Sequence, residues 1–218
     1  MLKGYSVYEK TFLFSMLALQ LFVYVLYPES IISMIAGVAG VASVVMFAKG
    51  RISGYFIGFI QTFTYLYLAW TNQFYGEVIE NLFYFATMVW GIFLWKKNMI
   101  KNDDGTEDVI GLKFTIPMWI GSIIISILGT AGMGYWLTSI GSAQPYTDAA
   151  TNILAIIAQF LMIFRYREQW VFWLIIDLLC IKLWFVAGNW AMVMMYIAWT
   201  INCLYGWYNW TKLSKSED

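Results

Sequence analysis

Apolar side chains fill eight long runs of this chain, and short polar segments separate them. Most of these runs reach the 17–25 residues that a helix needs to cross about 30 Å of hydrocarbon. The pattern therefore predicts an all-α integral membrane protein with eight transmembrane helices. The predicted helices cover about 11–27, 30–48, 53–70, 76–95, 114–137, 147–164, 170–186 and 189–210.

Composition supports this prediction and excludes several classes of protein. Apolar residues make up 61% of the 218 positions and charged residues 12%, whereas soluble domains average roughly 45–50% and 25%. Net charge is zero and no basic patch occurs outside the apolar runs, so we expect no nucleic-acid partner. The chain has no histidine and no P-loop, so we expect neither an enzyme, nor a metal site, nor a cofactor. Cys180 and Cys203 lie within apolar runs and are interpreted as packing residues.

Basic residues support the count of eight helices. If the N-terminus is cytoplasmic, twelve of the thirteen lysines and arginines fall on the cytoplasmic side, and the other, Lys182, lies within a helix. The predicted outer loops, near 28, 73, 140 and 188, carry none. This distribution follows the positive-inside rule and places both termini in the cytoplasm. The cytoplasmic set is Lys3, Lys10, Lys49, Arg51, Lys96, Lys97, Lys101, Lys113, Arg165, Arg167, Lys212 and Lys215.

Two parts of the chain resemble each other. The segment Trp90-Gly91-x-x-x-Trp95-x-Lys97 returns after 115 residues as Tyr205-Gly206-x-x-x-Trp210-x-Lys212, and the turn Lys49-x-Arg51 returns after 116 as Arg165-x-Arg167. We interpret 30–97 and 139–218 as three-helix repeats. Residues 1–29 add an N-terminal helix, and 98–138 form a cytoplasmic linker and a helix that restores the orientation. This 3+1+3 parallel repeat is a transporter architecture, in which the substrate is held near the midplane between the halves.

The most informative candidate site is Trp170-x-x-Trp173-x-x-x-Asp177, inside a predicted membrane helix. These positions share one helix face, and a carboxylate at membrane depth indicates a functional site. Indoles stack on planar or cationic solutes. Alternatively, Trp170 is an interface anchor, Trp173 faces lipid or packs, and Asp177 pairs with a structural lysine. Lys182 is a poor partner within the helix, because its spacing points it elsewhere; it either snorkels or forms an ion pair.

Other polar residues within the helices complete the candidate set. At a spacing of 116, Gln61 is the counterpart of Asp177 in the first repeat, and at 115 Tyr196 is the counterpart of Asn81. Tyr196 either covers the site or packs. The amides either bind a solute or join helices by hydrogen bonds. The amide candidates are Gln61, Asn81, Asn152 and Asn202.

On these motifs the chain resembles the PnuC family of bacterial vitamin transporters over about 30–212. The residues that carry the resemblance are Tyr75-Gly76-Glu77, Asn81 to Phe85, Trp90-Gly91 to Trp95, Arg165 to Trp170, and the Trp170/Trp173 pair. The resemblance implies a three-one-three fold related to SWEET sugar transporters and facilitated uptake of nicotinamide riboside for NAD synthesis. It also implies that Trp170 and Trp173 bind substrate and that Gln61 occupies a polar binding position.

The resemblance leaves the substrate open. The position of Asp177 is often asparagine in nicotinamide riboside carriers. An acid suits any cationic ring, which includes the thiazolium of thiamine, and suits neutral riboflavin less well. Two other classes are a retinal photoreceptor with Lys182 as its Schiff base, and an accessory membrane protein without a solute. The expected partners are a small vitamin and the lipid bilayer of the cell membrane, and a homo-oligomer is compatible with the sequence.

Overall fold

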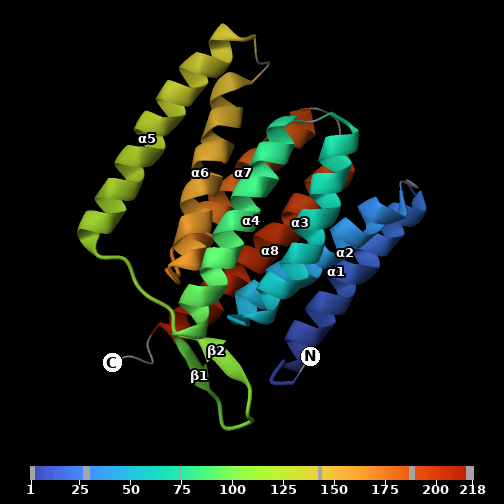
Figure 1. The fold of residues 1–218 in the computed structure, drawn as a ribbon, viewed down its shortest axis with the longest axis vertical. Helices are drawn as coiled ribbons and strands as arrows, with labels where there is room; N and C mark the ends of the chain where they lie inside the picture. Colours follow the sequence, from blue (N-terminus) through green and yellow to red (C-terminus); the bar gives the residue numbers. More distant parts are fainter. Residues whose placement is uncertain (1–2, 27–29, 74, 142–143, 187–189, 215–218) are drawn as a thin grey trace. The chain divides into compact units, whose positions relative to one another are not determined.

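The computed structural model describes residues 3–26, 30–73, 75–141, 144–186 and 190–214, which form eight α-helices and one β-hairpin (Figure 1). Each helix begins and ends within four residues of its predicted limits, so the predicted helices are confirmed. The predicted loops near 28 and 188, and Lys215, lie outside the described residues. The helices are α1 (Val7–Leu26), α2 (Ile31–Lys49), α3 (Ser53–Thr71), α4 (Tyr75–Lys96), α5 (Ile116–Ser139), α6 (Pro145–Ile163), α7 (Gln169–Val186) and α8 (Trp190–Leu213).

Five of these helices, within the described residues, are by themselves long and apolar enough to cross a membrane: α1, α2, α4 from Val78 onward, α5 and α6. The sequences of α3 and α8 contain more tryptophan, tyrosine and polar residues, whereas that of α7 is strongly apolar. A helix suits the hydrocarbon interior of a membrane, because lipid offers no hydrogen-bond partners to backbone N–H and C=O groups and a helix pairs these groups with one another. The chain is a multi-pass, helical membrane protein.

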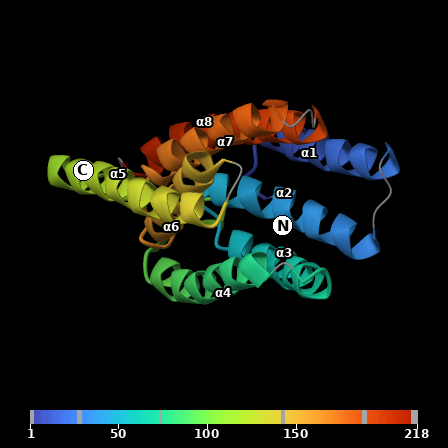
Figure 2. The same cartoon turned by 90° about the horizontal axis from the view of Figure 1, so that it is seen from above.

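The chain forms two compact units, one up to Ile110 and one from Gly111 onward. In the first unit, α1 packs on α2, α2 on α3, and α3 on α4. In the second unit, α5 packs on α6, α6 on α7, and α7 on α8; Figure 2 shows α7 and α8 side by side. Each unit therefore contains one leading helix followed by three helices that pack in chain order.

The turns that end α2 and α6 have the same backbone geometry. Gly50 and Arg165 both adopt positive φ, +81° and +68°. The N–H of each donates to the carbonyl three residues earlier, and the next N–H donates to the carbonyl five residues before it. The carbonyls of Gly50 and Arg165 accept from Val109 and Leu112 of the connecting segment, at 3.0 and 2.7 Å. A left-handed arginine costs about 1–2 kcal/mol, so packing of the turn holds Arg165 in this conformation.

The segment after α4, which the sequence predicted only as a linker, contains an antiparallel hairpin. Strand β1 (Met99–Lys101) pairs with β2 (Glu107–Val109), with Lys101 opposite Glu107. Gly105 has φ +76° and its N–H donates to the Asn102 carbonyl. The signal for this hairpin was Asp104-Gly105, a pair that favours tight turns. The fold is therefore all-helical apart from this hairpin.

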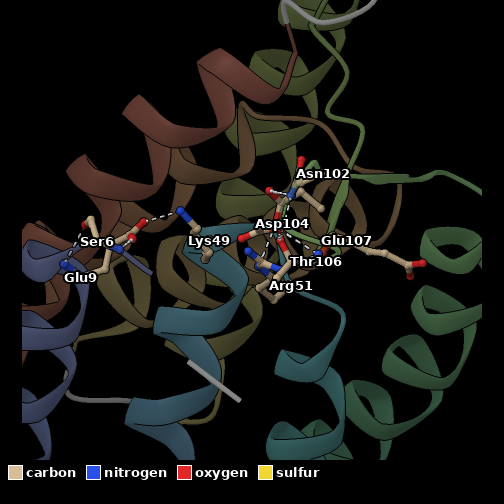
Figure 3. A network of polar contacts seen from close by, with 9 residues as sticks. Ser6, Glu9, Lys49, Arg51, Asn102, Asp104, Thr106 and Glu107 are labelled. Atoms are coloured by element: carbon tan, nitrogen blue, oxygen red, sulfur yellow. Dashed lines mark hydrogen bonds and ion pairs between the residues drawn. The ribbon is translucent and has the colours of Figure 1, made fainter. Parts of the chain in front are cut away.

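A polar network ties the hairpin to the N-terminal segment and to the end of α2 (Figure 3). Lys49 Nζ lies 2.7 Å from Glu9 Oε1, and Arg51 Nε lies 2.8 Å from Asp108 Oδ1. Both cations lie 5.8 Å from the centroid of the buried Tyr5 ring. The sequence predicted only that these two basic residues lie on the cytoplasmic side of the membrane. In the structure they are largely buried and paired within the first unit.

Candidate functional site

Asp177 lies in α7 and is buried, with 3% of its surface exposed. Its carboxylate Oδ2 accepts a hydrogen bond from the thiol of Cys203 in α8, with a sulfur–oxygen distance of 3.2 Å. Both cysteines are free and buried, as predicted for packing residues. The hydrogen bond was not predicted, because it joins residues 26 positions apart whose contact depends on how α7 and α8 pack. The structure thus adds Cys203 to the candidate site.

Trp170 is the second residue of α7 and is 4% exposed, so it is not a lipid-exposed anchor. Its indole lies directly against the backbone of α8 at Gly206, where an added Cβ would be 2.5–2.7 Å from three ring carbons. Trp210 contacts the indole edge-on, with ring centroids 6.3 Å apart. A side chain at Gly206 would occupy the space of the indole, so this glycine allows the close approach. The Trp170 Nε1–H has no acceptor among the described residues.

Trp173 and Tyr196 are partly buried and pack against one hydrophobic cluster of the second unit. Tyr196 also shares a hydrogen bond with Cys180. The remaining surface of Trp173 is available for another contact. The cluster consists of Leu154, Ala155, Ala158, Leu161, Phe172, Ile176 and Cys180.

Two residues of the second unit lie away from this buried group. Asn152 is exposed, and its Nδ2 donates to the Asp148 carbonyl of the same helix at 2.7 Å. The interpretation of Asn152 as a link between helices is therefore wrong. Lys182 is exposed near the end of α7, which agrees with a side chain that reaches toward the membrane surface. Asn202, by contrast, is buried in α8 beside Cys203.

In the first unit, Gln61 is half-buried in α3 and Asn81 is buried in α4. The Gln61 amide lies against Gly40 of α2, where an added Cβ would be 3.1 Å from Cδ. The neighbouring Thr62 is buried, and its hydroxyl donates to the sulfur of Met88 in α4 at 3.7 Å. Gly40 therefore leaves room for the predicted binding amide, while Thr62 joins α3 to α4.

Contacts in the two units correspond at a spacing of 115 residues. Thr62 and Met88 occupy the positions of Asp177 and Cys203, and each pair joins a polar oxygen to sulfur. In the same register, the edge contact of Tyr55 with Trp95 at 5.0 Å corresponds to that of Trp170 with Trp210. In this register the counterpart of Asp177 is Thr62, so the alignment of Gln61 with Asp177 was shifted by one residue. The error arose from aligning two basic turns whose backbones match at 115 and not at 116. The role of Gln61 in binding stays a prediction.

Two buried polar residues at the start of α7 were not singled out from the sequence. Glu168 and Gln169 are each 1% exposed. One oxygen of Glu168 accepts from Arg167 Nε at 3.0 Å. The other oxygen, and both amide atoms of Gln169, have no partner among the described residues. An unpaired buried polar group costs about 1–3 kcal/mol, so these side chains join the candidate site. The available signal was their place in the motif Arg165 to Trp170.

Residues 30–212 match the model of the nicotinamide mononucleotide transporter family. A nicotinamide riboside transporter PnuC of Haemophilus influenzae is 40% identical over 213 residues, which cover 97% of this chain and 93% of that protein. The chain belongs to the PnuC family. A nicotinamide riboside transporter PnuC of Neisseria mucosa is 36% identical to this chain, and the match covers 97% of this chain and 84% of that protein.

The fold agrees with this family membership. A crystal structure of the vitamin B3 transporter PnuC superposes with a TM-score of 0.83 at 36% identity, and the match covers 99% of this chain and 95% of that one. The resemblance inferred from the tryptophan motif is confirmed. The similar proteins are transporters, and the candidate residues are suited to binding a solute. Among the described residues, no three potential metal ligands cluster.

Proposed function

We propose that this protein carries nicotinamide riboside across the bacterial plasma membrane by facilitated diffusion. The observation that supports this most directly is the buried Asp177 carboxylate one helical turn from Trp173. The nicotinamide ring of the riboside is flat and positively charged. An indole offers it a stacking surface, and an ionised carboxylate offsets its charge. The names of the PnuC relatives support the same substrate.

Charge favours the riboside over its phosphorylated form, nicotinamide mononucleotide. A phosphate monoester carries a charge of about −1.5 to −2 at neutral pH and needs cationic partners. In α7 the only cation is Lys182, which is exposed, whereas Asp177 is buried and would repel a phosphate. Thiamine remains the second candidate, because its thiazolium ring is also cationic and Asp177 stands where riboside carriers often have asparagine.

We also propose the 3+1+3 repeat and the cytoplasmic location of both termini. The matched turns at Gly50 and Arg165, and the matched contacts at a spacing of 115, support a duplicated three-helix unit. Twelve of thirteen basic residues on one predicted side support the orientation. The location of the substrate at the midplane stays a prediction from the sequence.

Binding to the purified protein tests the substrate. Isothermal titration with nicotinamide riboside, nicotinamide mononucleotide, thiamine and riboflavin should give the tightest binding for the riboside. Asp177→Asn should improve the affinity for the mononucleotide relative to the riboside, because a neutral amide does not repel phosphate. Asp148→Asn, in α6, is the matched control and should leave this relative affinity unchanged. Tightest binding of thiamine would replace the proposed substrate, and absence of binding to all four would refute vitamin transport.

A further inference from the structure

We propose that Cys203 is a positioning residue that orients the Asp177 carboxylate toward the substrate, an inference that rests on the proposed function. Cys203 is 5% exposed, and its thiol donates to Oδ2 of Asp177 across the contact of α7 with α8. Among the described residues this is the only hydrogen bond to that carboxylate. The thiol engages one oxygen and leaves Oδ1 to contact a cationic ring.

The first unit shows why this contact is more than packing. At the equivalent positions, the Thr62 hydroxyl donates to the thioether of Met88. A contact between oxygen and sulfur is thus common to both units, but the direction of the hydrogen bond is reversed. A thioether has no proton to donate, whereas a thiol does. The carboxylate at position 177 needs a hydrogen-bond donor, and at position 203 a thiol supplies one where a thioether would not.

The hydrogen bond has a defined consequence for recognition. A buried carboxylate without a donor is free to rotate or to turn toward other polar atoms, and its charge is then less well placed. Donation from α8 restricts the Asp177 side chain and holds one face of the carboxylate in a fixed direction. The effect should appear in the discrimination of charge, and not in the affinity for the ribose or for the flat shape of the ring.

Reduced nicotinamide riboside is the appropriate probe, because it has the same ribose and carboxamide but an uncharged ring. The measurement is the ratio of the Kd values of the reduced and the cationic forms, for the parent and for each variant. Cys203→Ala should lower this ratio about fivefold, as expected for loss of one modest hydrogen bond. Cys203→Ser, which retains a donor, should restore most of the ratio. Ser126→Ala removes a hydroxyl that donates only within α5, to the Ser122 carbonyl; it is the control and should leave the ratio unchanged.

The outcomes separate this inference from the proposed function. If Cys203→Ala weakens both ligands equally, or weakens neither, Cys203 only packs and the inference fails while the transporter function stands. If the parent binds neither form, the proposed function fails and the inference fails with it. Infrared spectra provide a second test that needs no Cys203 variant to fold: Asp177→Leu should move the Cys203 S–H stretch to the frequency of a free thiol. An unmoved band would overturn the hydrogen bond itself.

Discussion

Gly206 in α8 allows the indole of Trp170 to lie against the helix backbone, and Gly206→Ala tests this contact. An alanine Cβ would lie 2.5 Å from Cδ2, 2.6 Å from Cε2 and 2.7 Å from Cε3 of the indole. Real Cβ atoms do not approach heavy atoms so closely, and the three carbons belong to the rigid fused ring, so the indole or the helix must move. The fully buried Trp210, which contacts the Trp170 ring edge-on, restricts that movement.

The change in free energy of unfolding that Gly206→Ala causes is the sum of two opposing effects. Replacing glycine by alanine within a helix stabilises it by about 1 kcal/mol, and overpacking a close contact costs about 1–3 kcal/mol. Gly132→Ala in α5 provides the first term alone, because a Cβ there meets no described atom within 4 Å. The two variants should therefore differ in free energy of unfolding by about 2 kcal/mol, with Gly206→Ala the less stable.

Thermal unfolding in detergent, together with riboside titration, measures the effect. Gly206→Ala should lower the midpoint relative to Gly132→Ala and weaken riboside binding if Trp170 contacts the substrate. Adding Trp170→Phe should recover part of the lost stability, because the smaller ring leaves room for the new methyl group. Equal stability of the two glycine variants would refute the close approach of the indole to Gly206.

Three further changes test other parts of the structure. Trp173→Ala should weaken riboside binding about five- to tenfold through lost stacking, and an unchanged Kd in titration would make Trp173 a packing residue. Asp108→Asn removes the ion partner of the largely buried Arg51 and should lower the free energy of unfolding by about 2 kcal/mol. Arg51→Met in that background should recover part of this loss, and no loss in urea titration would count against the ion pair. Burial raises the pKa of Tyr5 from 10.0 to about 12, so stability should fall as pH rises from about 10 to 12, because only the unfolded phenol ionises there. Tyr5→Phe should make this slope smaller, and an unchanged slope in melting curves would assign it to other groups.

The sequence predicted the helices closely because their signal is local. A run of about twenty apolar residues has to cross the membrane as a helix, whatever its neighbours are. The family was likewise recognisable from short motifs around Trp90-Gly91 and Trp170. The hairpin at Asp104-Gly105 also carried a local turn signal, although the surrounding charged residues made the segment read as a linker.

The register of the proposed repeat shows where the sequence was insufficient. Aligning the basic residues made Gln61 the equivalent of Asp177, whereas the backbone hydrogen bonds of the turns make Thr62 its equivalent. A basic residue in a turn can occupy either of two neighbouring positions, because its long, flexible side chain extends into the same solvent from both. Backbone geometry and helix contacts do not tolerate such a shift, since one residue turns a side chain by about 100° around the helix.

The sequence by itself determined the number and limits of the helices, the membrane environment and the family, because these depend on composition and on short motifs. Only the tertiary structure decided that Cys203, which the sequence predicted as a packing residue, donates a hydrogen bond to the buried Asp177. It also decided that the indole of Trp170 packs against Gly206. It also showed that Lys49 and Arg51 are paired within a buried network. Each of these facts is a contact between residues far apart in the chain, and such contacts depend on how helices pack and rotate against each other.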